Sequence, residues 1–96
     1  MPAITRTSIV VAGRDQVASD LAGETVLLGL RTARYYGLAD VGARIWSLLR
    51  EPISVSAISE TIASEYDVPL ERCEADVVRF LEDLADQELI EVRGGA

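Results

Sequence analysis

Few side chains in this sequence could carry out covalent chemistry. The 96 residues include no histidine and a single cysteine, Cys73. A Cys-His dyad, a Ser-His-Asp triad, a histidine metal site and an internal disulfide are therefore all excluded. The remaining candidates are carboxylates, and they recur at helix-surface spacing and form no inward-facing acid–base pair. We expect a protein that is not an enzyme and that has no catalytic residue, cofactor or metal.

The distribution of charge indicates what kind of ligand could bind. Residues 1–50 carry six Arg and four acidic residues, whereas residues 51–96 carry three Arg and twelve acidic residues. The acidic half would repel nucleic acid and attract a peptide rich in Lys or Arg, with an affinity that falls as salt rises; a solvated acidic face is the alternative. No long uncharged run or signal-peptide pattern is present. We expect a cytoplasmic protein that binds neither nucleic acid nor membrane.

The first candidate binding element is an apolar strand whose open edge could accept an extended peptide through backbone hydrogen bonds. Leu27 is expected on the face opposite its two neighbours, where a docked peptide or a helix could cover it, although ordinary core is the alternative. Gly29 could permit the close approach of another backbone, or it could be a tolerated surface glycine. The candidate peptide-binding residues here are Val26, Leu27, Leu28, Gly29, Leu30 and, at the end of the edge, Arg31.

The second candidate element is an acidic helix that would face this strand. Charged residues spaced three or four apart lie beside an apolar stripe, either as the rim of a groove or as intrahelical ion pairs on a solvated face. The stripe is expected to contain Leu70, Cys73, Val77, Phe80 or Leu81, and Leu84. Phe80 could form the floor of a pocket or belong to the core. The charged residues are Arg72, Asp76, Arg79 and Asp83, and the candidate peptide-binding residues on this helix are Asp76, Val77, Arg79, Phe80 and Asp83.

A small α+β domain of winged-helix-like form must position these residues. Alternating and helical periodicities predict one domain over residues 1–96, with an antiparallel sheet of three or four strands followed by three helices and with flexible ends at 1–5 and 94–96. A hairpin turn is expected at Ala22-Gly23. The expected strands are 8–12, 17–21, 24–30, 35–38 and 89–92; the expected helices are 40–50, capped by Asp40, then 55–66, capped by Ser54, and 70–88.

Two segments, GETVLLGLRTARYYGLADVGARIWSLL (23–49) and ADVVRFLEDLADQELIEV (75–92), carry a resemblance that covers residues 8–93. They resemble the PqqD-like peptide-recognition family, and the Tyr35-Tyr36-Gly37-Leu38 motif is most similar to the stand-alone recognition proteins of lasso-peptide gene clusters. Three positions depart from the family pattern: Ala33 replaces a turn glycine, Gly29 replaces a polar residue, and Glu88 replaces a helix-ending glycine.

The resemblance implies a non-catalytic protein that binds the leader segment of a ribosomally made lasso-peptide precursor. The leader would add antiparallel to the third strand, against the third helix, and would then be presented to a separate cysteine protease and a cyclase. One alternative is a winged-helix DNA-binding module, but residues 70–88 hold two Arg and seven acidic residues, the opposite of a basic recognition helix. Another is a regulatory subunit whose Leu27 and Trp46 surface binds a protein partner.

Overall fold

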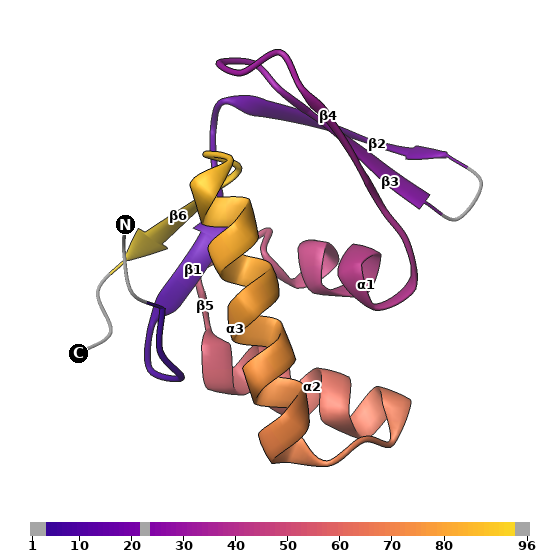
Figure 1. The fold of residues 1–96 in the computed structure, drawn as a ribbon, viewed down its shortest axis with the longest axis vertical. Helices are drawn as coiled ribbons and strands as arrows, with labels where there is room; N and C mark the ends of the chain where they lie inside the picture. The colour runs from indigo at the N-terminus through magenta and orange to yellow at the C-terminus, as the bar shows by residue number, and fades with distance from the viewer. Residues whose placement is uncertain (1–3, 22–23, 94–96) are drawn as a thin grey trace.

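A computed structural model of the chain describes residues 4–21 and 24–93, in which six short strands and three helices follow one another (Figure 1). The α+β class is confirmed, and each sheet is antiparallel, but the strands divide into two three-stranded sheets. The expected hairpin turn at 22–23 lies outside the described residues. In chain order the elements are β1 (Ile9–Ala12), β2 (Gln16–Leu21), β3 (Glu24–Gly29), β4 (Tyr35–Leu38), α1 (Asp40–Leu48), β5 (Ile53–Ser54), α2 (Val55–Tyr66), α3 (Leu70–Asp86) and β6 (Ile90–Arg93).

The first strand belongs to a different sheet from the hairpin that follows it. β1 lies between β5 and β6, in the order β5-β1-β6, and pairs with β6 from Ile9 opposite Arg93 to Ala12 opposite Ile90. The chain leaves this sheet at Gly13, whose N–H donates to the Leu89 carbonyl at 2.9 Å. A Cβ atom at Gly13 would lie 3.1 Å from that oxygen, so a glycine suits the crossing between the sheets. The two-residue β5 is too short for a periodicity to reveal it.

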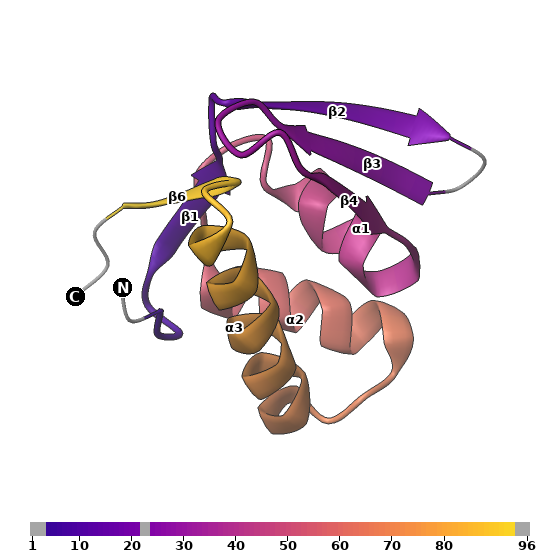
Figure 2. The same ribbon diagram turned by 45° about the horizontal axis from the view of Figure 1, so that its top comes forward.

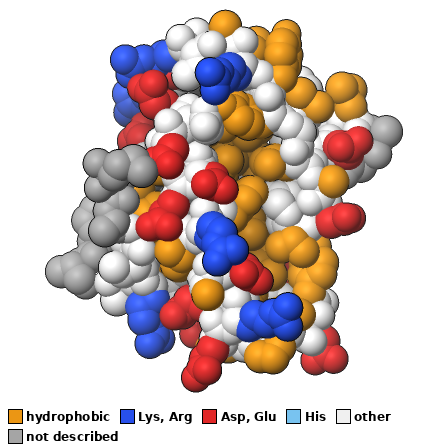
Figure 3. Space-filling model, in the orientation of Figure 1, with side chains coloured by type: hydrophobic (Ala, Val, Ile, Leu, Met, Phe, Trp, Pro, Cys, Tyr) orange, Lys and Arg blue, Asp and Glu red, His pale blue; other side chains and the backbone are white. Residues whose placement is uncertain are grey.

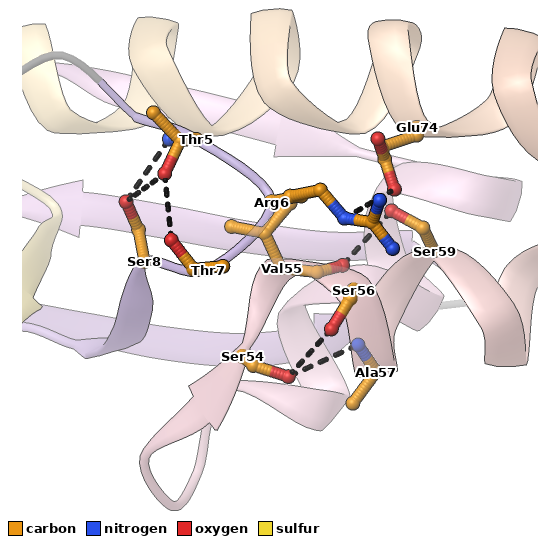
Figure 4. Close-up of polar contacts among 10 residues, drawn as sticks. All are labelled: Thr5, Arg6, Thr7, Ser8, Ser54, Val55, Ser56, Ala57, Ser59 and Glu74. Carbon is orange, nitrogen blue, oxygen red and sulfur yellow. Dashed lines mark hydrogen bonds and ion pairs between the residues drawn. The ribbon is translucent and has the colours of Figure 1, made fainter. Parts of the chain in front are cut away.

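The ends expected to be flexible, 1–5 and 94–96, lie outside the described residues except for residues 4 and 5. Ile4 is buried, and the Thr5 N–H donates to the Ser8 hydroxyl at 3.0 Å. Figure 4 shows this turn beside the start of α2, with Arg6 reaching Glu74 of α3 at 4.0 Å. The turn therefore closes one end of the domain.

Helix caps follow the sequence signals in one case and not in the other. The Ser54 hydroxyl accepts a hydrogen bond from the Ala57 N–H at 3.1 Å, as expected for the cap of α2 (Figure 4). The expected cap Asp40 is wrong: Ala39 is the N-cap of α1 and makes no side-chain cap bond. Asp40 is already the first helical residue, with a left-handed φ of 50°, and the Ala39 carbonyl accepts from Gly42 at 3.1 Å.

The core lies between the three helices and the inner faces of the two sheets, with α1 beneath the β2-β3-β4 sheet (Figure 2). The predicted stripe of α3 is buried at Cys73, Val77, Leu81 and Leu84. Leu70, expected in the same stripe, is instead 43% exposed because it is the first residue of the helix and projects beyond the packed region. Burial of these side chains is the main favourable term that holds the helices on the sheets.

The departures from the family pattern have local structural counterparts. Ala33 and Glu88, which stand where glycines are common, both have left-handed φ values, 57° and 61°. At the end of α3 the Glu88 N–H donates to Ala85 and the Leu89 N–H donates to Leu84, the paired bonds of a Schellman motif, which favours glycine at the position of Glu88. Gly29 is buried, and a Cβ there would lie 2.7 Å from the Thr32 hydroxyl. A polar side chain at position 29 would therefore clash.

Candidate functional site

The predicted binding edge at residues 26–30 is wrong, because β3 is the central strand of its sheet. β3 pairs with β2 from Gln16 opposite Gly29 to Leu21 opposite Glu24, and with β4 from Thr25 opposite Leu38 to Leu28 opposite Tyr35. Both of its sides are therefore occupied. The turn over residues 31–34 folds the chain back so that β4 takes the position in which an added peptide was expected.

The individual residues of the predicted edge have different environments. Leu27 is fully buried in the core, as its alternative interpretation held, so it is not available to a docked peptide. Val26 and Leu28 are half-buried on the other face of the sheet, and Leu30 is 56% exposed beyond the end of β3. Trp46 is also buried, which removes the Leu27 and Trp46 surface proposed for a protein partner.

The open edge nearest the helices belongs to β4 (Figures 1 and 2). The Gly29 N–H donates to the Arg34 carbonyl at 2.9 Å, and bonded pairs alternate with non-bonded pairs along antiparallel strands. Tyr36 and Leu38 therefore bond to β3, whereas Tyr35 and Gly37 turn their N–H and C=O groups away from it. Within 4–21 and 24–93, no hydrogen bond from another segment ends on these four groups.

The third helix lies beside this edge. The Tyr36 hydroxyl donates a hydrogen bond to the side chain of Gln87, just after α3. Two turns before Gln87, the Phe80 ring lies against Gly42 at the start of α1. A Cβ atom built at Gly42 would be 3.5 Å from a ring carbon of Phe80 and 3.7 Å from a side-chain carbon of Leu38. Figure 3 shows hydrophobic side chains exposed as a band along this face, with charged groups beside it. β4, α1 and α3 therefore border one apolar groove.

The lower part of the groove deepens into a pocket of about 620 Å³ between the three helices. Its walls are mostly apolar side chains of α1, α2 and α3, including Ile45, Ile62 and Tyr66. Three of the five helix residues predicted from the sequence line the pocket, namely Asp76, Val77 and Phe80, whereas Arg79 and Asp83 do not. The pocket is suited to apolar side chains, with polar contacts only at its rim.

The charged residues of α3 remain available to a ligand. Among the described residues, none of Arg72, Asp76, Arg79 and Asp83 takes part in an ion pair, so the intrahelical pairs that were the alternative interpretation do not form. Arg31, predicted to meet a ligand at the end of the strand, pairs with Glu88 at 3.2 Å. Cys73 lines the pocket but is buried. This burial and, to a smaller extent, the negative charges of Asp76 and Glu74 raise the pKa of the Cys73 thiol, which favours its unreactive protonated form.

Sequence reasoning missed the β4 edge and the part of the pocket formed by Val41, Tyr66 and Val68. One available signal was connectivity. Three strands joined by short turns form a meander in which sequential strands are neighbours, so the last of them must be an edge. The pocket lining gave no comparable signal, because it depends on how α1 packs against the end of α2.

Known proteins resemble this chain in sequence and in fold. The family model described as coenzyme PQQ synthesis protein D (PqqD) matches residues 24–90. The chain is 41% identical to TbiB1, solved in complex with the TbiA(beta) leader peptide; the match covers 84% of this chain and 94% of that one, with a TM-score of 0.79. No curated protein sequence matches the chain.

Two more distant structures share the fold. The PqqD part of Methylobacterium extorquens PqqCD, described as a stand-alone RiPP recognition element, is 23% identical over 93% of this chain and 95% of its own, with a TM-score of 0.77. A lasso peptide synthetase B1 complexed with the leader peptide is 22% identical over 85% and 96% of the two chains, with a TM-score of 0.77. No helix in the described ranges is both long and apolar enough to cross a membrane. The domain with the open β4 edge and the apolar groove along α3 is therefore a member of the PqqD family.

Proposed function

We propose that this protein binds the leader segment of a ribosomally made lasso-peptide precursor, without catalysis, as an added strand on β4. The observation that carries the proposal is the open backbone edge of Tyr35 and Gly37 beside the apolar groove of α3. The 41% identity to TbiB1, a protein solved with a leader peptide, supports the same ligand class. The proposal replaces the third strand of the sequence prediction with β4 and keeps the third helix as the facing wall.

The edge can supply both affinity and direction. Tyr35 and Gly37 together offer two N–H and two C=O groups to an antiparallel neighbour. Each backbone hydrogen bond contributes about 0.5 to 1.5 kcal/mol net. Alternate side chains of the bound segment would then point toward the helices, where the half-buried ring of Phe80 gives an apolar contact.

The charged residues of α3 act in the proposal as a rim that guides the leader. Asp76 lies at the pocket, while Arg79 and Asp83 are exposed and lie nearer the C-terminal end of the helix. Rim charges mainly affect encounter rate and register, so their effect should weaken as salt rises. We expect the affinity for a basic leader to fall with salt, and to fall less steeply in a double Asp76→Asn and Asp83→Asn variant.

The bound precursor must then reach enzymes that the chain does not itself provide. Cys73 is the only thiol, it is buried, and the sequence has no histidine to activate it. Cleavage of the leader and closure of the product would therefore fall to a separate cysteine protease and a cyclase. In this role the protein is an adaptor that holds the leader while others act on the rest of the precursor.

The test is a fluorescence-anisotropy titration with the labelled leader segment of the precursor encoded beside the gene. Wild-type protein should bind saturably, and Phe80→Ala should weaken binding about ten-fold or more, as expected for loss of a central aromatic contact. Leu21→Ala, on the opposite edge strand and 61% exposed, is the matched control and should bind as the wild type does. Thermal unfolding of each variant verifies that it is folded. An absence of binding by the wild type would refute the proposal.

A further inference from the structure

One ion pair joins two of the three helices that form the pocket. The Arg44 guanidinium of α1 donates two hydrogen bonds to the carboxylate of Glu65 in α2, one from Nε at 2.9 Å and one from Nη2 at 2.8 Å. Within the described residues, no other hydrogen bond or ion pair links these two helices. A guanidinium fork that binds both carboxylate oxygens fixes the distance and the orientation of the two groups together. The pair therefore sets how α1 and α2 meet.

The pair lies beside the walls of the pocket. Each of its members is followed in the chain by a residue that lines the pocket and is preceded, one turn earlier, by another. A shift of either helix at the pair would therefore move a wall. The four wall residues are Val41 and Ile45 of α1 and Ile62 and Tyr66 of α2. Neither Arg44 nor Glu65 lines the pocket, so any effect that they have on a ligand there is indirect.

The pair is fixed although it lies at the surface. The side chains of Arg44 and Glu65 are 39% and 40% exposed. The remaining guanidinium nitrogen, Nη1, donates to the Ser47 hydroxyl at 3.0 Å, and that hydroxyl donates to the Arg44 carbonyl at 2.6 Å. Ser47 thus holds the guanidinium against its own helix. The hydrogen bonds of the pair raise the pKa of Arg44 and lower the pKa of Glu65, so both groups remain charged at neutral pH.

An apolar pocket needs such a constraint to keep one shape. Its volume is about 620 Å³ and its walls are mostly apolar. Without a link between α1 and α2, the helices could move inward, which would bury apolar surface and is favoured by the hydrophobic effect, or they could move apart. A ligand would then bind only the fraction of molecules in which the pocket has the correct width. A pocket that is already formed avoids this cost, and its ligand binds more tightly.

We propose that Arg44 and Glu65 are positioning residues for leader binding, which hold α1 and α2 at one separation and so keep the pocket preformed. This inference rests on the proposed function. It adds two residues that act through the pocket walls and make no contact with the leader in the pocket. Loss of the pair lets the two helices move relative to one another, and the Kd for the leader rises because the free protein presents the formed pocket for only part of the time.

The first test replaces either member of the pair in the anisotropy titration with the labelled leader. Glu65→Gln keeps the size of the side chain and removes its charge, whereas Arg44→Lys keeps the charge and removes the fork. Each should raise the Kd about three- to ten-fold. Glu91→Gln is the matched control. It breaks the exposed pair of Glu91 with Arg93, 3.4 Å apart on β6, and should bind within about two-fold of the wild type.

A double-mutant cycle shows whether the pair acts through the pocket. Phe80→Ala removes an apolar side chain from the α3 wall. If the pair acts by shaping the same pocket, Glu65→Gln should weaken binding less in the Phe80→Ala background than in the wild type. A pair that only stabilises the fold would leave the two losses multiplicative, and that result would overturn the inference.

The single thiol of the chain reports on the pocket without any leader. Cys73 lines the pocket and is buried, so movements that open the pocket expose it to iodoacetamide. In native protein, Glu65→Gln and Arg44→Lys should be alkylated about three-fold faster or more, whereas Glu91→Gln should react as the wild type does. Alkylation through global unfolding depends only on stability, so the free energy of unfolding of each variant is measured by denaturant titration.

The outcomes separate this inference from the proposed function. A wild-type Kd in both pair variants, while Phe80→Ala weakens binding, would overturn the inference and leave the proposed function intact. A wild type that binds no leader would refute the proposed function. In that case, faster alkylation in the pair variants alone would still support the effect of the pair on the pocket, and unchanged alkylation would overturn it.

Discussion

Replacement of Gly37 by proline tests strand addition at a single backbone group. The Gly37 N–H points away from β3, so proline removes an outward donor and leaves the bonds between β3 and β4 intact. Space is available, because no atom lies within 4 Å of a Cβ built at this position. The bound leader would lose one hydrogen bond and keep an unsatisfied carbonyl, which costs about 1 to 3 kcal/mol. We expect the Kd for the leader to rise by about 5- to 150-fold.

Two controls separate the lost donor from other effects in the same anisotropy titration. Gly37→Ala adds a Cβ and keeps the N–H, so it should bind within about two-fold of the wild type. Ala18→Pro removes an outward donor from β2, at the opposite edge of the same sheet, and should also leave leader affinity unchanged. Equal affinities for Gly37→Pro and the wild type would refute strand addition on β4. By contrast, Leu28→Pro is unsuitable, because it would break a bond of the central strand β3.

Three further predictions concern stability and reactivity. Glu88→Gly should raise the free energy of unfolding by about 1 kcal/mol, because glycine relieves the left-handed backbone; a lower value in denaturant titration would show that the exposed pair with Arg31 matters more. Glu65 accepts two hydrogen bonds from the Arg44 guanidinium, which lowers the pKa of the Glu65 carboxyl group. The pair therefore stabilises the folded state above the ordinary pKa of glutamate, and this stabilisation is lost as the pH falls through the lower pKa of the folded protein. Glu65→Gln should accordingly flatten the acid side of the stability profile, whereas an unchanged profile would contradict this linkage. Burial raises the pKa of Cys73, so its alkylation by iodoacetamide at pH 8 should be at least about ten-fold slower in the native than in the denatured protein, and equal rates would show that the thiol is accessible.

Local features of the fold could be predicted from the sequence, because they depend on neighbouring residues. The Ser54 cap, the apolar spacing of α3 and the end of α2 at Tyr66 are all set by residues within one or two turns of one another. The Asp40 cap failed because a left-handed backbone at that residue makes Ala39 the cap, which the residue type alone does not indicate.

Long-range features could not be predicted in the same way. β1 contains a normal apolar run, but its partners β5 and β6 come from distant parts of the chain, so its sheet was not evident. In β3 the alternation was correctly expected to place Leu27 opposite Val26 and Leu28, but apolar residues lie on both faces and the pattern does not say which face meets the core.

The most direct test of leader binding as an added strand is amide hydrogen exchange of the isotope-labelled protein, followed by NMR with and without the leader peptide. The Tyr35 and Gly37 amides, which point to the open edge, should become protected on binding, while Tyr36 and Leu38 are already bonded to β3. The outward amide of Ala18 on β2 should not change. If Tyr35 and Gly37 become protected and the outward amide of Ala18 does not, addition of the leader to β4 would be established. Saturating leader that leaves both amides unprotected would contradict it.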